Sequence, residues 1–218
     1  MTFSTARERD ILERSNIYDI LAPDTVAEVR KRYHEPHRCY HNWDHALTVL
    51  QRVTAIVEVS GVADGTMPIA ALYHDAVYVV GATDNELLSC DAFCDDNVNE
   101  PWFRTSLEGG EHLASRVCRY IQATAKHGKL EREDVPIDTA LFMDCDMLGF
   151  AEPDWATFVA QDYAVIAELM TRYDSDEVAA GRETFLRGLL AKRSIFLSDY
   201  FANYEGPARS NIERLLAR

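Results

Sequence analysis

The sequence predicts an all-α fold, and three observations support this class. Apolar residues recur three and four positions apart along nearly every segment, which is the spacing of one face of an α-helix. Strict alternation of apolar and polar residues, the pattern of a half-buried strand, is almost absent. Prolines and glycines lie between the periodic segments, where helices begin and end. We therefore expect a helical bundle.

Length and composition describe an ordinary globular protein. The chain has 218 residues, of which 47% are hydrophobic and 27% are charged, so we expect a single domain over residues 1–218 with one sizeable core. No apolar run approaches the roughly 20 residues of a membrane span. The charged N-terminus lacks the apolar core of a signal peptide. These features predict a cytoplasmic protein that does not bind membranes.

Charge and cysteine content argue against several kinds of partner and site. The 36 acidic and 22 basic residues give a formal net charge of −14, which repels polyanions and argues against binding of duplex nucleic acid. A metal ion with a few local basic groups could still hold a small phosphate. The five cysteines form no CxxC pair, so the sequence indicates neither a disulfide framework nor a zinc ribbon.

Turn residues divide the first part of the chain into three expected helices. The first falls within residues 4–20. The second starts behind Asp24, whose carboxylate could cap it, and ends at Pro36. After the His-rich connection HEPHRCYHNWDH, the amphipathic segment DHALTVLQRVTAIVEVS predicts a third helix, which Gly61 and Gly65 close.

The rest of the chain also reads as helices. One helix is expected over residues 67–80, and Gly81 ends it. The next helix is expected to begin at Thr83 or Asp84. Two later helices correspond to EHLASRVCRYIQATAKH and IDTALFMDCDMLGF. Beyond Pro153 we expect two or three more, in DWATFVAQDYAVIAELMTRY, DEVAAGRETFLRGLLAKR and ARSNIERLLAR.

One of these segments carries a charged pair in apolar surroundings. IAALYHDAVYVV, residues 69–80, contains only two strongly polar side chains, the adjacent His74 and Asp75. An ionised carboxylate in such a run costs several kcal/mol unless something compensates it. A bound cation and a hydrogen-bonded His–Asp pair would each do so, and this segment alone leaves both interpretations open.

Two further segments favour the cation. ALFMDCDMLGF places Asp144 and Asp146 in another apolar helical run, and His45 lies in the first turn of the helix after Asn42. Imidazole and carboxylate groups together suit Mn, Fe, Co, Ni, Mg or Zn. Such a set leaves positions open for water and substrate, which is typical of a catalytic rather than a structural metal site.

The order of these residues resembles a known family. The spacing H…HD…D is similar to that of the HD superfamily of metal-dependent phosphohydrolases. More closely, RCYHNWDH, ALYHDAVY, TDNELLS and MDCDMLG look like a small bacterial group described as predicted HD-superfamily metal-dependent phosphohydrolases. The resemblance implies an HD-type helical bundle with its metal-site core in residues 33–150 and the helices of residues 151–218 packed on it.

The resemblance also implies one divalent metal ion and its ligands. The implied ligands are His45, His74, Asp75 and Asp146. Asp144 is the alternative to Asp146 if the helix register differs. His41, four residues before His45, could be a further ligand or a group that faces the substrate.

Other residues are candidates for catalysis. Glu86, in the DNELLS segment, could orient or deprotonate the attacking water, or it could be a first-turn acid that stabilises only the helix dipole. His127, at a helix end, could be a third imidazole beside the metal, a proton donor to the leaving group, or a cation favoured by the dipole. His41 is the other candidate proton donor.

Three residues are candidates for substrate binding. Arg38 precedes the His41 segment and Lys126 flanks His127, so both could hold phosphate oxygens. Tyr78 could donate a hydrogen bond to the substrate from the end of the metal-binding segment.

These residues predict a phosphohydrolase that cleaves a small phosphate ester with a metal-activated water. The choice of a nucleotide as substrate rests on family analogy alone. The main alternative is a non-catalytic regulatory module that binds a nucleotide or a metal. A dinuclear iron oxygenase on the same scaffold would need further inward histidines. The expected partner is a small phosphorylated substrate, and a homodimer is an alternative to a monomer.

Overall fold

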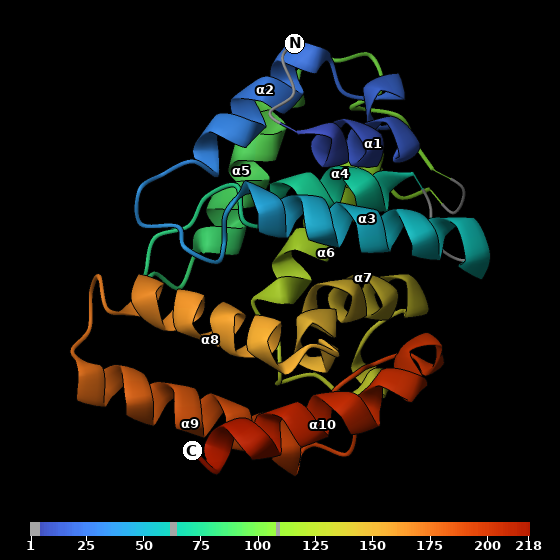
Figure 1. Ribbon diagram of the computed structural model, residues 1–218. Helices are drawn as coiled ribbons and strands as arrows, with labels where there is room; N and C mark the ends of the chain where they lie inside the picture. Colours follow the sequence, from blue (N-terminus) through green and yellow to red (C-terminus); the bar gives the residue numbers. More distant parts are fainter. Residues whose placement is uncertain (1–4, 62–64, 108–109) are drawn as a thin grey trace. The chain divides into compact units, whose positions relative to one another are not determined.

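The computed structural model describes residues 5–61, 65–107 and 110–218 (Figure 1). Within these ranges the repeating secondary structure is helical, and the one β-bridge is isolated. The predicted all-α class is therefore confirmed.

The chain divides into two compact units, Met1–Ala125 and Lys126–Arg218. The boundary falls inside the expected metal-site core of residues 33–150. Of the expected ligands, the two histidines and Asp75 belong to the first unit, and Asp146 belongs to the second. The single domain over residues 1–218 stays a prediction.

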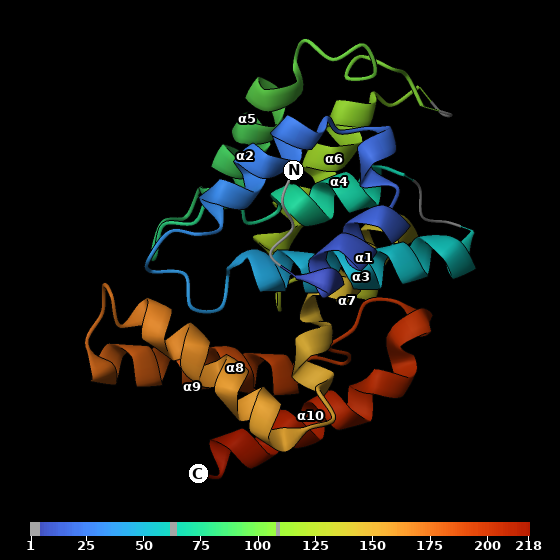
Figure 2. The ribbon, with the colours of Figure 1, turned by 45° about the horizontal axis from the view of Figure 1, so that its top comes forward.

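In the described part of the first unit, helices surround one central helix. They are α1 (Ala6–Arg14), α2 (Pro23–Arg32), α3 (Trp43–Ser60), α4 (Thr66–Tyr73), α5 (Asn85–Asn97) and α6 (Leu113–Thr124). All residues of α4 are buried, and this helix contacts α3, α5 and α6 (Figure 2). Since α4 has no charged side chain, it can be covered on every side without the cost of burying a charge.

The predicted boundaries of α3 are confirmed. The Asn42 side chain accepts hydrogen bonds from the backbone N–H groups of Asp44 and His45, at 3.0 and 3.2 Å, and so caps the helix. Gly61 ends it in the left-handed region, at a φ of 63°. The Asn42 cap also fixes the backbone of His45, one of the expected metal ligands.

The predicted start of α2 was wrong by two residues. The helix begins at Pro23, with Ala22 as its N-cap, and Asp24 lies inside the first turn. Proline has no N–H to leave unpaired and its φ already suits a helix, so it takes the first position. The expected first helix, within residues 4–20, corresponds to α1, although residue 4 lies outside the described residues.

The predicted helix over residues 67–80 ends early, at Tyr73. Two hydroxyl groups from other helices bind the backbone that would continue it. Tyr33 donates to the carbonyl of Leu72 at 2.9 Å and accepts from the N–H of Asp75 at 3.2 Å. The Ser89 hydroxyl accepts from the N–H of Val77 at 3.0 Å. These side-chain hydrogen bonds take the place of the backbone hydrogen bonds that would continue the helix, so Asp75 lies in a turn.

The described part of the second unit is also helical. It contains α7 (Ile137–Met147), α8 (Trp155–Leu169), α9 (Ser175–Ala191) and α10 (Ala202–Leu216). Asp154 caps α8, Asp174 caps α9, and α10 contacts both of these helices. Three helices therefore follow Pro153, as predicted, although α10 begins before the ARSNIERLLAR segment.

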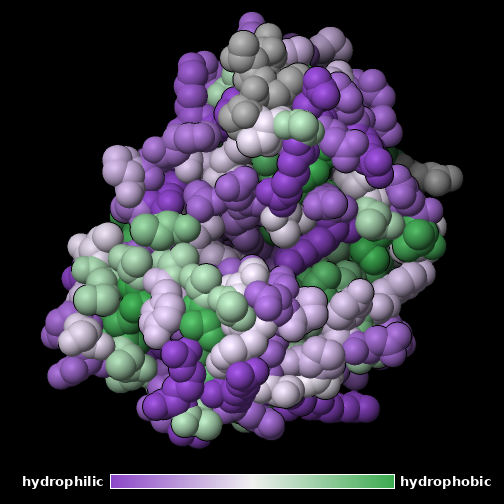
Figure 3. Space-filling model, in the orientation of Figure 1, coloured by the Kyte–Doolittle hydropathy of each residue, from purple (hydrophilic) through white to green (hydrophobic). Residues whose placement is uncertain are grey.

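Apolar side chains reach the surface of the second unit at α8. Figure 3 shows hydrophobic residues gathered where Figure 1 draws this helix, and Tyr163 is 57% exposed. Among the described residues, no helix combines the length and apolar character needed to cross a membrane.

Candidate metal centre

His74 lies at the C-terminal end of α4, and one of its ring nitrogens is hydrogen-bonded to the backbone of that helix. It is the C-cap of this helix, and its side chain is 1% exposed. Its Nδ1 lies 2.9 Å from the carbonyl oxygen of Ala71. Because a carbonyl only accepts, Nδ1 carries a proton and Nε2 of the neutral ring offers a lone pair. The backbone of α4 thus selects the tautomer that a metal ligand needs.

Two further ligand atoms meet this lone pair. His74 Nε2 lies 3.0 Å from Asp75 Oδ2 and 3.1 Å from His45 Nε2. His45 Nε2 and Asp75 Oδ2 are 3.6 Å apart. The side chains of His45 and Asp75 are 8% and 16% exposed. Three of the residues expected to bind a metal therefore converge in the first unit, and we call them the His/His/Asp cluster.

The spacing and chemistry of the His/His/Asp cluster fit one divalent cation. Ligand atoms that lie about 2.1 Å from an ion are roughly 3.0 to 3.4 Å from one another. Asp75 Oδ2 and His74 Nε2 are both acceptors, and they face each other across 3.0 Å. Two acceptors at this distance repel each other unless a proton or a cation lies between them. The cluster could therefore hold a metal ion.

The charge of Asp75 suits the same role. Burial raises the pKa of this carboxyl, but in the absence of a metal ion its attraction to protonated His74, its hydrogen bond with that ring and its attraction to protonated His41 and His45 outweigh burial and hold the pKa well below its usual range. Asp75 is therefore ionised at neutral pH. It can offset part of the charge of a bound cation.

Aromatic rings bring two more predicted residues to the cluster. The ring centroid of His41 lies 5.7 Å from that of His45 and 4.4 Å from that of Tyr78. Tyr40 packs against the same two histidines, with its centroid 5.0 Å from that of His41 and 4.9 Å from that of His45. The structure thus places His41 and Tyr78 beside the His/His/Asp cluster, and their roles toward a substrate stay predictions.

Arg38 is enclosed by protein. Its side chain is 0% exposed, and the guanidinium lies over the rings of Tyr33 and Tyr78, at 5.1 and 5.6 Å from their centroids. It donates hydrogen bonds to Glu35 Oε2 at 2.8 Å and to the carbonyls of His41 at 3.0 Å, Asp75 at 2.6 Å and Ala76 at 3.2 Å. This geometry makes Arg38 a clamp on the backbone of two site residues. Its expected contact with a phosphate stays a prediction.

In the second unit, His127 and Asp146 form a pair. His127 Nε2 lies 2.8 Å from Asp146 Oδ2, and the two side chains are 20% and 13% exposed. Asp146, like His45 and His74, can offer one ligand atom to a metal ion. An imidazole that is hydrogen-bonded to a carboxylate fixes the orientation of that carboxylate, as the hydrogen-bond partners of metal ligands do.

The Asp144 carboxylate is hydrogen-bonded to the segment before α10. Its carboxylate accepts from the N–H of Leu197 at 2.6 Å and from the N–H and hydroxyl of Ser198 at 2.8 and 2.6 Å. Burial raises the pKa of Asp144 to about 6, although these hydrogen bonds lower it. Because its oxygens hold the segment before α10, Asp144 is the weaker candidate for a metal ligand.

The structure describes the local surroundings of two further predicted residues, Lys126 and Glu86. Lys126, with His127, lines a hollow of about 10 Å³ in the second unit. This volume is about that of a single water, so it cannot hold a phosphate ester. Glu86 lies in the first turn of α5, where the helix dipole favours an acid. The roles of Lys126 at a phosphate and of Glu86 at a water stay predictions.

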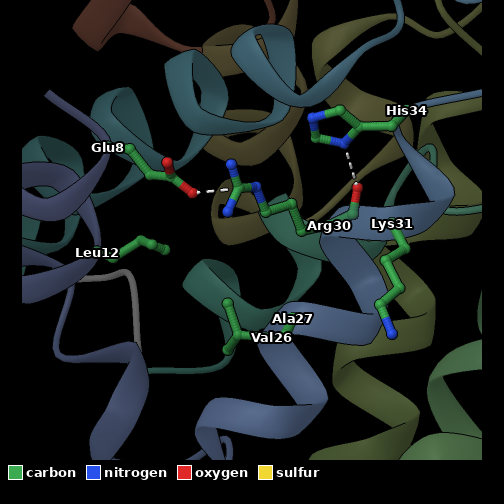
Figure 4. Close-up of a pocket in the computed structure, with 7 residues that line it drawn as sticks. All are labelled: Glu8, Leu12, Val26, Ala27, Arg30, Lys31 and His34. Atoms are coloured by element: carbon green, nitrogen blue, oxygen red, sulfur yellow. Dashed lines mark hydrogen bonds and ion pairs between the residues drawn. The ribbon is translucent and has the colours of Figure 1, made fainter. Parts of the chain in front are cut away.

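A larger pocket, of about 440 Å³, lies beside α1 and α2 in the first unit (Figure 4). Its lining residues are Glu8, Leu12, Val26, Ala27, Arg30, Lys31 and His34. Figure 4 shows Arg30 extended toward Glu8, with Nε and Oε1 3.3 Å apart, and Trp43 donates to the same oxygen at 3.0 Å. This pair of a buried Glu8 and a half-buried Arg30 links α1 to α2, and none of the predicted site residues lines the pocket.

Reasoning from the sequence missed Tyr33 and Ser89, whose hydroxyl groups hold the turn that carries Asp75. Tyr33 begins the family-like region and Ser89 ends the TDNELLS motif, which is the only signal that the sequence offers for either. Nothing in the local pattern indicates which backbone groups they reach.

The protein-family models and the curated proteins add no relative. The chain matches no protein-family model, and it matches no curated protein. The resemblance to the HD superfamily therefore stays a prediction from the four sequence motifs.

Proposed function

We propose that this chain is a metal-dependent phosphohydrolase that cleaves a small phosphate ester. The observation that carries the proposal is the convergence of His45 Nε2, His74 Nε2 and Asp75 Oδ2 within 3.6 Å. A divalent ion held there would supply Lewis acidity and a water of lowered pKa, which is the chemistry that phosphate-ester hydrolysis needs.

The proposed ligand set is completed by Asp146. Its support is the family resemblance and its ability to offer a ligand atom. Two carboxylates would then offset the two charges of the ion, and two imidazoles would complete the protein ligands. In this proposal His127 acts through its bond to Asp146 and keeps that carboxylate oriented.

We assign the proton transfer to His41. This half-buried imidazole lies against His45 and Tyr78, and an imidazole can give up a proton near neutral pH. Tyr78 beside it can donate a hydrogen bond to a phosphate oxygen. Glu86 remains the candidate that orients the water, and Lys126 the candidate that contacts the phosphate. Arg38 supports the site by holding the carbonyls of His41 and Asp75.

The substrate class follows from charge and analogy. A net charge of −14 disfavours long polyanions, which leaves small phosphate esters. A nucleotide is the first class to test, by analogy with the family alone.

Metal content tests the central claim. The protein is purified without chelators, and its bound metals are measured by mass spectrometry for the wild type, His74→Ala and Asp75→Asn. We expect one ion per chain in the wild type and a large loss in both variants. Asp44→Asn is the matched control, because it makes the same change at an 83% exposed carboxylate in the first turn of α3. Wild-type metal content in both cluster variants would overturn the proposal.

The enclosure of Arg38 favours a second candidate, a regulatory module that binds metal or nucleotide without turnover. A guanidinium bonded to three carbonyls has little capacity left for a phosphate. A panel of nucleoside monophosphates, diphosphates and cyclic nucleotides, assayed with several metals, separates the two. Hydrolysis that is lost in Asp75→Asn supports the enzyme. Bound metal without hydrolysis of any ester supports the module.

A further inference from the structure

Three of the five cysteines meet where α5 packs against α6. Cys90 and Cys94 are four residues apart on α5, so their side chains share one face of the helix. Cys118 faces them from α6. The Cys90 thiol donates to the carbonyl of Cys118 at 3.6 Å, and the Cys118 thiol is hydrogen-bonded to the thiols of both Cys90 and Cys94. We call these three residues the thiol cluster.

The residues of the thiol cluster differ from the other two cysteines in their contacts with one another and in their exposure to solvent. Cys118 and Cys94 are half-buried, whereas Cys90 is 3% exposed. Cys39 is exposed and Cys145 is buried, and neither belongs to the cluster. A small oxidant can therefore reach the cluster from the side of Cys118 and Cys94. Each of these two thiols has another thiol of the cluster within hydrogen-bonding distance.

We propose that the thiol cluster is an oxidation site, at which a peroxide joins Cys118 to Cys90 in a disulfide and Cys94 is the competing partner of Cys118. A thiolate attacks one peroxide oxygen, the O–O bond breaks and hydroxide leaves, which gives a sulfenic acid. The second thiol attacks that sulfur, the S–S bond forms, the S–O bond breaks and water leaves. Two thiols are oxidised to one disulfide, and one peroxide is reduced.

The three thiols of the cluster differ in their ionisation. The hydrogen bond from Cys118 lowers the pKa of Cys90, and the same contact raises the pKa of Cys118. Burial raises the pKa of Cys94 to about 12.

Mapping of the oxidised full chain tests the proposal. The reduced protein is treated with one equivalent of hydrogen peroxide, its remaining thiols are blocked with N-ethylmaleimide, and its peptides are identified by mass spectrometry. No Lys or Arg lies between Arg52 and Arg104, so trypsin alone leaves Cys90 and Cys94 in one peptide. A second protease that cleaves beside Asp91 separates them.

We expect a linkage between Cys90 and Cys118, loss of two thiols per chain, and full recovery of both thiols with dithiothreitol. In Cys90→Ser the linkage should move to Cys94 and Cys118, and Cys118→Ser should form neither. Cys145→Ser, which changes a buried thiol outside the cluster, should behave as the wild type. Retention of all five thiols, a linkage that omits Cys118, or oxidation that dithiothreitol does not reverse would each overturn the proposal. The wild-type map decides the matter even if a variant fails to fold.

Discussion

Arg38→Lys tests whether the enclosed guanidinium holds the metal centre together. Lysine keeps the positive charge and most of the aliphatic stem, but its single nitrogen cannot replace the three nitrogens of the guanidinium. Nη1 donates to the carbonyls of both His41 and Asp75, whereas Nε donates to Glu35 at 2.8 Å and Nη2 donates to the carbonyl of Ala76 at 3.2 Å. A lysine nitrogen at the position of Nη1 therefore leaves the acceptors of Nε and Nη2 without their donors. The loss of two charge-assisted hydrogen bonds, at about 1.5–3 kcal/mol each, predicts a decrease of roughly 3–6 kcal/mol in the free energy of unfolding.

Urea unfolding of the metal-free protein at neutral pH, followed by circular dichroism, measures this decrease. Arg14→Lys is the matched control. Arg14 makes an ion pair with Asp10 at 3.0 Å, but its side chain is 75% exposed. An exposed pair of this kind contributes less than about 1 kcal/mol, so the control should unfold close to the wild type.

The same variant separates the two roles considered for Arg38. If Arg38 contacts a phosphate and not the backbone, Arg38→Lys will leave the free energy of unfolding unchanged and raise the KM for the ester. That result would refute the clamp described above. A large loss of stability together with a loss of bound metal would support it.

Three other substitutions test the caps and carboxylates of the two units. Asn42→Ala removes the cap of α3 and should lower the free energy of unfolding by about 1 kcal/mol in urea, and an unchanged midpoint would contradict the cap. The pKa of Asp144 is raised from 3.8 to about 6, so its contribution to stability is complete below pH 4 and is lost as the pH rises through 6. Relative to Asp144→Asn, the wild type should therefore lose up to about 3 kcal/mol between pH 4 and pH 7, and a difference that is independent of pH would contradict this. His127→Ala should weaken metal binding about 10- to 100-fold in a chelator competition, and an unchanged affinity would argue against Asp146 as a ligand.

Local signals predicted both ends of α3 but misplaced the start of α2, where Pro23 takes the first position ahead of Asp24. Asn42 and Gly61 bound α3 because an amide cap and a left-handed glycine act on the backbone beside them. The end of α4 could not be predicted in this way. It depends on the hydroxyl groups of Tyr33 and Ser89, which come from other helices.

At the candidate site, too, the local sequence predicted some features, whereas others depend on tertiary packing. An isolated His–Asp pair in an apolar run indicated a buried charge, and the structure brings His45 to that pair. The position of Arg38 before the histidine segment suggested a phosphate contact. The sequence gives no sign that its guanidinium lies between two tyrosine rings and four acceptors, because those partners are brought together only by tertiary packing.

The early end of α4 also has an electrostatic consequence. The carbonyl end of a helix carries a partial negative charge, equivalent to roughly half an elementary charge. His74 and Asp75 stand at this end, and because α4 is buried along its whole length, little water screens the field. The helix and the Asp75 carboxylate therefore select ions by sign before any ligand bond forms. A cation is drawn to this position, whereas a phosphate is repelled from it until a cation has arrived.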